Sequence, residues 1–224
     1  MSGGVHIEQS SRGPFDVVCL AASLGGVQAY GKLLARLPAT FPAPVVLVQH
    51  RPADAEDRFV AVLGRRSALP VVPLASGRPL RPGTVHVVPG RTRAVFDDRG
   101  QPWLRQAEGH RVADELFASA AKAFGPRVLA AVLTGRLDDG AKGVRNVKGA
   151  GGRVLAQDEA TCGELGFQMP AAAIATGCVD FVLPLEVLAD ALTALVMVPG
   201  AAGMMRVALP SWARVVTPRP AYAG

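Results

Sequence analysis

The chain has 224 residues and a formal net charge of +6, and half of its residues are hydrophobic. This apolar share is enough for a full core, so global disorder is excluded, and the length suits one sizeable domain. The longest late uncharged run, Ala191 to Met205, is interrupted by Pro199, and it is shorter than the roughly 20 apolar residues of a membrane-spanning helix. Membrane insertion is therefore not expected, and the N-terminus has no signal-peptide pattern.

The cysteines and the charge balance bound the compartment and the partners. Cys19, Cys162 and Cys178 are odd in number and never spaced C-x-x-C, so we expect reduced thiols and a cytoplasmic location. The basic surplus favours encounters with an acidic partner. A zinc finger, an RNA-binding signature and a basic-aromatic stripe are all absent from the sequence, so nucleic acid is not an expected partner.

Short apolar runs alternate with helical patterns along the chain. Seven runs predict strands: Val17–Ala21, Val45–Val48, Val71–Pro73, Val85–Val88, Val128–Thr134, Val154–Ala156 and Phe181–Leu183. Most of them lack apolar-polar alternation, which is typical of strands buried on both faces of a parallel sheet. Apolar residues at helical spacing predict three helices, along Val27–Leu37, Leu116–Phe124 and Leu185–Val196.

One segment departs from this alternation. Ala94–Phe96 and Pro102–Leu104 flank a turn with Gly100, which predicts a small antiparallel hairpin. The whole pattern predicts a doubly wound, mainly parallel α/β sheet of about seven strands with helices on both faces. The expected organisation is an N-terminal tail at 1–14, a catalytic domain at 15–198 and a basic, Pro- and Ala-rich tail at 199–224.

In an open parallel sheet, ligands bind outside the carboxyl ends of the strands. Ser23 directly follows the first predicted strand, and Gly25 and Gly26 after it allow the tight turn that presents a serine hydroxyl. The helix N-terminus that follows offers N–H groups to a developing oxyanion. A serine N-cap is the simpler interpretation. The glycines also suit a nucleotide-binding module, although Gly-x-Gly-x-x-Gly is absent.

Two further residue types sit at the same predicted sheet edge. His50 ends an apolar run, where a neutral imidazole is placed to accept a proton. Asp138 or Asp139 follows the longest strand-like run and is placed to orient an imidazole. Taken singly, a solvated loop histidine and an Asp-Gly turn or N-cap are the simpler interpretations. Their coincidence with Ser23 at one edge favours a Ser-His-Asp site.

Seven motifs occur in order between Asp16 and Val196: A-S-L-G-G at Ala22–Gly26, V-Q-H-R-P at Val48–Pro52, V-x-P-G at Val87–Gly90, D-E-L-F at Asp114–Phe117, L-T-G-R-L-D-D-G-A at Leu133–Ala141, L-A-Q-D-E-A-T-C at Leu155–Cys162 and F-Q-M-P at Phe167–Pro170. With these motifs the chain resembles the catalytic domain of chemotaxis protein-glutamate methylesterases, the CheB type. The fold of that family is a doubly wound, mainly parallel sheet, which agrees with the fold predicted from the apolar runs.

The resemblance implies a role for each matching residue. Ser23 would be the nucleophile, His50 the general base and then acid, and Asp139, which matches the aspartate before Gly-Ala, the residue that orients His50. The implied reaction is hydrolysis of glutamyl 5-O-methyl esters on the cytoplasmic helices of chemoreceptors, with release of methanol. Family members also deamidate selected receptor glutamines. The resemblance implies no metal or organic cofactor, and water is the co-substrate.

The predicted positions of several residues, together with the resemblance, indicate the surroundings of the nucleophile. Backbone N–H groups near Leu24 and in the Gly135–Arg136 turn are expected to receive the oxyanion. The arginines would attract acidic receptor helices, although ordinary solvated arginines and a core methionine are the alternative interpretations. The residues expected at the oxyanion site and the substrate rim are Leu24, Gly25, Arg51, Arg136 and Met169.

Several residues depart from the family pattern. The departures are Leu24 for Thr, Arg51 for Met, Arg111-Val112 for Pro-Ser, Arg136-Leu137-Asp138 for Met-Gly-Asn and Gln168 for Gly. The predicted triad is intact, but these changes alter its rim. They motivate one alternative, a non-catalytic adaptor of the same fold that docks on a receptor or signalling partner.

Typical family members carry an N-terminal receiver domain that regulates the esterase. Only about 15 residues precede the first predicted strand here, well below the usual minimum of a domain. We therefore expect activity that is constitutive or is controlled by a separate response-regulator chain.

Overall fold

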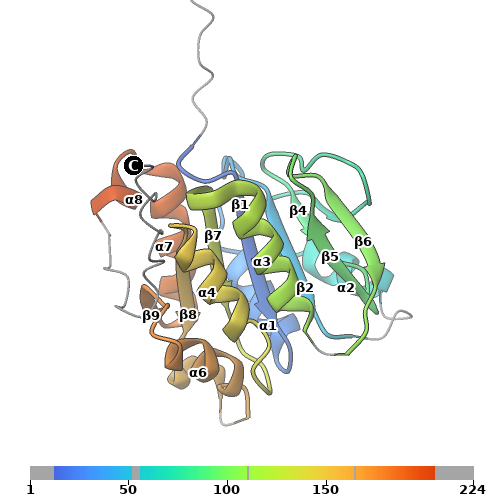
Figure 1. Ribbon diagram of the computed structural model, residues 1–224. Helices are drawn as coiled ribbons and strands as arrows, with labels where there is room; N and C mark the ends of the chain where they lie inside the picture. The colour runs from blue at the N-terminus through green and yellow to red at the C-terminus, as the bar shows by residue number, and fades with distance from the viewer. Residues whose placement is uncertain (1–12, 52–55, 110, 164, 205–224) are drawn as a thin grey trace, which may run out of the picture.

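The computed structural model describes residues 13–51, 56–109, 111–163 and 165–204. Its centre is a seven-stranded sheet in the order β3-β4-β2-β1-β7-β8-β9 (Figure 1), in which every neighbouring pair is parallel. The predicted doubly wound, mainly parallel sheet is confirmed. The strands are β1 (Val17–Ala22), β2 (Val45–Gln49), β3 (Val71–Pro73), β4 (Val85–Val87), β7 (Val128–Val132), β8 (Arg153–Gln157) and β9 (Phe181–Leu183).

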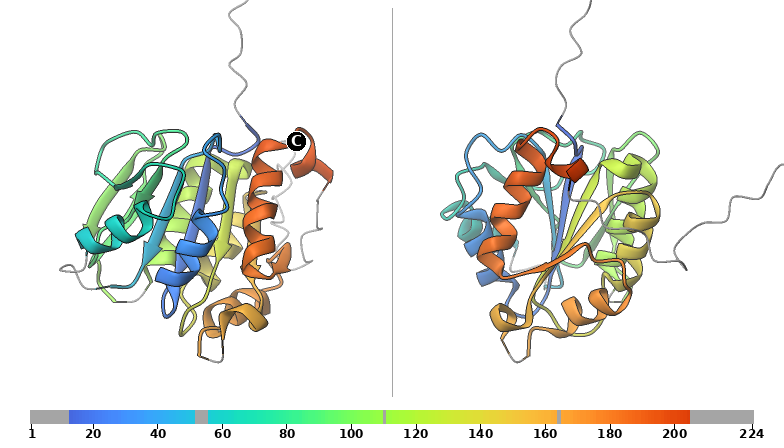
Figure 2. Two further views of the ribbon diagram at one scale, coloured as in Figure 1. Left: turned by 180° about the vertical axis from the view of Figure 1, so that it is seen from behind. Right: turned by 90° about the vertical axis from the view of Figure 1, so that its left-hand side faces the viewer.

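Helices cover both faces of the sheet, so the domain has three layers (Figure 2). One face packs against α1, α2 and α7, and the other against α3, α4 and α6. The helices are α1 (Gly26–Leu34), α2 (Glu56–Gly64), α3 (Val112–Phe124), α4 (Ala141–Gly149), α5 (Glu159–Cys162), α6 (Gln168–Ala175), α7 (Leu185–Met197) and α8 (Ala201–Met204), with a short 3-10 helix at Gly125–Arg127. In the described ranges, none of these helices is long and apolar enough to cross a membrane.

The central strands are apolar on both faces because each face has its own core. Successive side chains of a strand point to opposite faces. In β1, Val18 and Leu20 therefore join the core under α1 and α7, whereas Val17 and Cys19 join the core under α3 and α4. This is why β1 is a continuous run of buried apolar residues without alternation.

The predicted hairpin is also present, as the separate antiparallel sheet of β5 (Thr92–Phe96) and β6 (Pro102–Gln106). Gly100 has a φ of 73°, in the left-handed region that favours glycine. Phe96 anchors the hairpin, because its ring packs edge-on against Phe124 of α3 with 5.1 Å between ring centroids. The strands extend beyond the predicted bounds into polar residues that carried no apolar signal.

The sequence patterns did not single out α2, α4 and α6. The α4 segment contains few apolar residues and two glycines, and it is buried mainly through Val144 and Val147. A Cβ at Gly143 would lie 2.7 Å from Phe117 Cβ of α3, so the glycine serves close helix packing. Helix α8 lies within the range predicted as a C-terminal tail, and residues 205–224 of that range, like residues 1–12, lie outside the described residues.

The topology selects one point on the sheet for a binding site. Strands β1 and β7 are neighbours, but β1 leads to β2 on one side and β7 leads to β8 on the other. The loops after their carboxyl ends therefore diverge, and ligands of doubly wound sheets bind at such a switch point. Ser23 follows β1 and Asp139 follows β7, so both residues start from this point.

Candidate active site

Ser23 sits in a turn that is held from both neighbouring strands. Its backbone N–H donates to the Thr134 carbonyl at 2.9 Å, and Gln49 Nε2 donates to the Ser23 carbonyl at 3.1 Å. Gly25, with a φ of 79°, is the N-cap of α1 and turns the chain into that helix without a side-chain cap. The Ser23 hydroxyl is therefore not the N-cap of α1, and the simpler interpretation of this residue is wrong.

Two polar side chains at the ends of buried strands support this turn. Thr134 Oγ1 donates to the Leu24 carbonyl at 3.0 Å, and the Thr134 backbone N–H donates to Gln157 Oε1 at 2.9 Å. The strand β7 ends at Val132, two residues before the predicted end at Thr134. Sequence reasoning missed Gln49 and Gln157 as supports, although a glutamine closing an apolar strand is a detectable signal.

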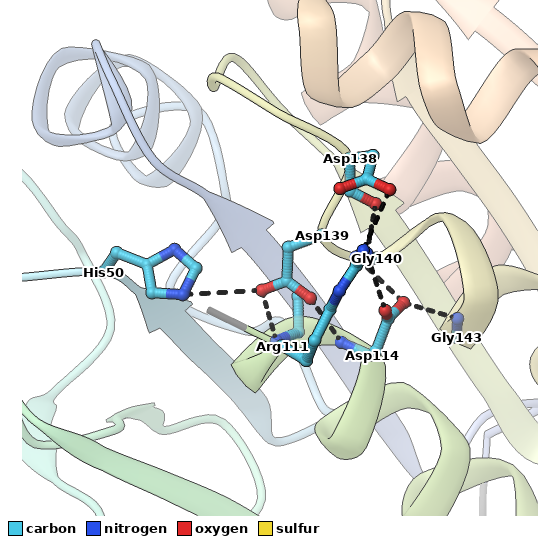
Figure 3. Close-up of polar contacts among 8 residues, drawn as sticks. His50, Arg111, Asp114, Asp138, Asp139, Gly140 and Gly143 are labelled. Atoms are coloured by element: carbon cyan, nitrogen blue, oxygen red, sulfur yellow. Dashed lines mark hydrogen bonds and ion pairs between the residues drawn. The ribbon is translucent and has the colours of Figure 1, made fainter. Parts of the chain in front are cut away.

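Asp139 is held by the helix on the other side of the site (Figure 3). Its Oδ2 accepts from the Ala113 N–H at 2.8 Å and its Oδ1 from the Asp114 N–H at 2.9 Å, both in the first turn of α3. Free N–H groups at a helix N-terminus suit a carboxylate. Asp139 is thus not an N-cap of its own helix α4, whose N-cap is Gly140. It binds a helix that lies far away in sequence.

The buried position of Asp139 sets its ionisation. The residue is 3% exposed, and burial raises the pKa of its carboxyl group from 3.8 to about 6, while the N–H bonds from Ala113 and Asp114 act in the opposite direction. His50 Nε2 lies 3.7 Å from Asp139 Oδ2, a charge contact longer than a hydrogen bond. An ionised Asp139 therefore stabilises the protonated imidazole of His50.

Three of the predicted residues meet in one cavity. The cavity measures about 280 Å³ and is lined by Ser23, His50, Arg111, Arg136, Leu137, Asp138 and Asp139. The hydroxyl, imidazole and carboxylate thus share one space at the switch point, although they are far apart in the chain. Arg136 lines the same cavity, as the rim prediction required.

Other predicted rim residues lie elsewhere. Leu24 and Gly25 line a neighbouring hollow together with Leu165. The Arg51 guanidinium packs 4.4 Å above the centre of the Phe59 ring and donates to the Val88 carbonyl at 2.8 Å, and Arg51 is not among the residues that line the cavity.

Met169 is buried beneath the site. It is 1% exposed, which leaves its side chain to the core rather than to a substrate. Its N–H donates to the Gly135 carbonyl at 3.0 Å. A Cβ on Gly135 would penetrate the Met169 sulfur and lie 3.0 Å from Ser23 Cβ, so this turn has room only for glycine.

Some backbone N–H groups around Ser23 already donate a hydrogen bond within the protein, and others are available to a substrate. The Gly135 N–H donates to the Gly166 carbonyl at 2.6 Å, so this half of the predicted Gly135–Arg136 donor pair is occupied. In the described part of the chain, no hydrogen bond uses the backbone N–H of Leu24 or Arg136. A hydroxyl, an imidazole, a carboxylate and available N–H donors are the groups that acyl transfer requires.

Four lining residues, Arg111, Arg136, Leu137 and Asp138, come from positions where the chain departs from the pattern of the family that it resembles. Arg111 pairs with Asp138 through Nη2 and Oδ2 at 3.0 Å, so two departures form one ion pair across the rim. Leu137 adopts a φ of 65°, unfavourable for a non-glycine residue, and its N–H donates to Gln168 Oε1 at 2.9 Å. The departures are thus coupled to one another in space, which the sequence alone does not reveal.

Among the described residues, no group of three His, Cys, Asp or Glu side chains is placed to hold a metal ion.

Comparisons with known proteins find similar chains and a similar fold. The catalytic domain of the CheB methylesterase of Thermotoga maritima has a similar structure, with a TM-score of 0.74 and 31% identity over 81% of this chain and 99% of that one. The protein-glutamate methylesterase/protein-glutamine glutaminase of Moorella thermoacetica is 39% identical over 81% of this chain, and its counterpart 1 of Saccharophagus degradans is 39% identical over 78%.

The chain matches only part of those two relatives, since the alignments cover 44% and 49% of their lengths. The sequence profile described as CheB methylesterase matches residues 18–192, which span β1 to α7 and include Ser23, His50 and Asp139. On this match and on the structural likeness, the chain belongs to the CheB methylesterase family.

Proposed function

We propose that the chain is a serine-type protein-glutamate methylesterase that hydrolyses glutamyl 5-O-methyl esters on chemoreceptor-like proteins. The observation that carries the proposal is the shared cavity of Ser23, His50 and Asp139 at the switch point of the sheet. It is supported by relatives that carry the name of this activity. Ser23 is the nucleophile, His50 the general base and acid, and Asp139 the residue that orients His50.

The first half of the reaction transfers the acyl group to the enzyme. A serine hydroxyl is a weak nucleophile until a base takes its proton. The ring nitrogen of His50 that does not face Asp139 takes this proton as Ser23 Oγ bonds to the ester carbonyl carbon. The carbonyl oxygen becomes an oxyanion, which the backbone N–H groups of Leu24 and Arg136 receive. His50 then gives its proton to the leaving methoxide, and methanol departs.

The second half restores the enzyme. Water attacks the acyl-Ser23 ester while His50 takes one of its protons, and a second oxyanion forms at the same N–H groups. This intermediate collapses, His50 returns the proton to Ser23 Oγ, and the product is a glutamate carboxylate. One donor of this kind contributes about 3–4 kcal/mol of transition-state stabilisation. Asp139 stabilises the imidazolium in both halves.

The same site suits a second reaction. The relatives' names also include protein-glutamine glutaminase, and with a glutamine side chain the leaving group is ammonia instead of methanol. We therefore propose deamidation as the second activity. The relatives' names and the polar cavity favour an enzyme over the non-catalytic adaptor. The cytoplasmic location and the acidic helices of a methylated receptor remain part of this proposal.

The experiment is methanol release from methylated chemoreceptor fragments by the wild-type chain and by Ser23→Ala. Loss of the nucleophile should lower the rate by about 10³-fold or more while the thermal melt stays unchanged. Ser119→Ala is the matched control, because this hydroxyl lies on α3 and donates to the Glu115 carbonyl at 2.8 Å. Near-normal methanol release by Ser23→Ala would contradict the proposal.

A further inference from the structure

A second buried carboxylate lies beside Asp139 and takes no part in the steps above. Asp114 is 6% exposed and comes from the D-E-L-F motif in the first turn of α3. Its Oδ1 accepts two backbone N–H groups at the start of α4, from Gly140 at 3.0 Å and from Gly143 at 2.7 Å. Its Oδ2 receives Arg111 Nη1 at 3.3 Å. Three donors to one buried carboxylate indicate that Asp114 has a specific structural role beside the site.

Each of the two carboxylates binds the N-terminus of the helix that the other one adjoins (Figure 3). Asp139 stands directly before α4 and binds the N–H groups that begin α3, whereas Asp114 stands at the beginning of α3 and binds the N–H groups that begin α4. Each helix start is therefore held by the other. The approach depends on Gly143, where a Cβ would lie 3.0 Å from the Asp114 backbone.

We propose that Asp114 is a positioning residue for the catalytic relay: it holds the loop that carries Asp139, keeps that carboxylate directed at His50, and its negative charge moves the acid limb of the reaction to higher pH. The inference rests on the proposed function and adds a residue to it. Asp114 is not among the residues that line the cavity, so it acts through the groups that it holds, the loop of Asp139 and the Arg111 side chain.

The charged groups around Asp139 determine in which direction each substitution shifts its pKa. They are His50 after β2, Arg111 and Asp114 at the start of α3, Asp138 and Arg136 in the loop before α4, and Lys142 in the first turn of α4. The negative charge of Asp114 raises the pKa of Asp139, in addition to the larger effect of burial. Removing that charge favours the ionised Asp139, and removing the positive charge of Arg111 disfavours it.

The test is the pH profile of kcat/KM for methanol release by wild type, Asp114→Asn and Arg111→Gln. The amide oxygen of Asp114→Asn still accepts the two α4 N–H groups, whereas its NH2 group cannot accept from Arg111 Nη1, so the fold and most of the plateau rate are retained. Its acid limb should move to lower pH by roughly half a unit, which gives about threefold more of the plateau activity at pH 5. Arg111→Gln should move the limb to higher pH, by less, because Arg111 is half-exposed.

Two further variants separate positioning from simple structural support. Asp114→Ala removes the acceptor and should lower kcat by about 10-fold or more at every pH with little change in KM, and Asp114→Asn should rescue kcat. Glu115→Gln is the matched control, because the Glu115 carboxylate pairs with Arg93 at 2.9 Å and leaves the limb in place. Thermal melts of all variants identify any that fail to fold.

The outcomes are distinct. Opposite shifts for Asp114→Asn and Arg111→Gln support the inference. An acid limb that is unchanged in Asp114→Asn, or that moves to higher pH, overturns it while the proposed function stands. A wild-type chain that neither releases methanol nor reacts at Ser23 with a phosphonate probe overturns the proposed function, and the positioning role falls with it.

Discussion

A methyl group on Gly135 is the smallest change that should disable the site. In Gly135→Ala the new Cβ would penetrate the Met169 sulfur and would lie 3.0 Å from both Met169 Cγ and Ser23 Cβ. Met169 is fully packed in the core under α3 and α4, so it has no open space to move into. Either Met169 or the Ser23 turn must shift.

The magnitude follows from these contacts. Overpacking a filled core by one methyl group costs about 1–3 kcal/mol of unfolding free energy. A shift of Ser23 by about 1 Å relative to His50 costs on the order of 10²-fold in rate. We therefore expect Gly135→Ala to lower the free energy of unfolding, measured by urea denaturation, by this amount and to lower methanol release on the order of 10²-fold.

Two variants check the cause. Gly149→Ala is the matched control, because a Cβ there meets nothing within 4 Å, and its rate and midpoint should stay near those of the wild type. In the double variant Gly135→Ala/Met169→Ala the sulfur contact is gone, so the two stability losses should sum to less than additivity predicts. Its activity should stay low because the Ser23 contact remains. Wild-type rate and stability in Gly135→Ala would refute the reasoning.

Two more predictions concern Asp139 of the catalytic relay and Leu137 beside it. Because burial raises the pKa of Asp139 from 3.8 to about 6, its ionisation destabilises the folded state progressively as the pH rises from about 4 to 6. Asp139→Asn removes this penalty, so the Tm of the variant minus that of the wild type should be larger at pH 7.5 than at pH 4.5. The variant should also lose about 10³-fold or more in methanol release. A Tm difference that does not change with pH would contradict this prediction. Leu137 is 59% exposed at a φ of 65°, so Leu137→Gly should raise the free energy of unfolding by about 0.5–1 kcal/mol, and a lower urea midpoint would count against it.

Much of the fold was predictable from local patterns. Each of the seven predicted strands is present, because strands buried on both faces must be apolar throughout, and that requirement is visible in β1 and β7. Helix α4 was not singled out. It is buried mainly through Val144 and Val147 and approaches α3 closely at Gly143, and so few apolar residues give no periodic signature in the sequence.

The site, too, was predictable from the sequence only in part. The sequence placed Ser23, His50 and one of two aspartates after the ends of strands, and the family motif chose Asp139. It placed Arg51 and Met169 on the rim, whereas the structure turns Arg51 onto Phe59 and buries Met169 under Gly135. Which way such side chains point depends on neighbours that are remote in sequence, and one sequence does not specify them.

By itself, the sequence determined the layered parallel sheet, the family pattern and the residue types that gather at the carboxyl ends of β1, β2 and β7. Only the tertiary structure decided that the Asp139 carboxylate binds the start of α3, that Asp114 binds the start of α4, and that Arg111 pairs with Asp138. The physical reason is that hydrophobic periodicity is a local property, whereas a buried charge takes its partners from whatever donors the folded chain brings near it.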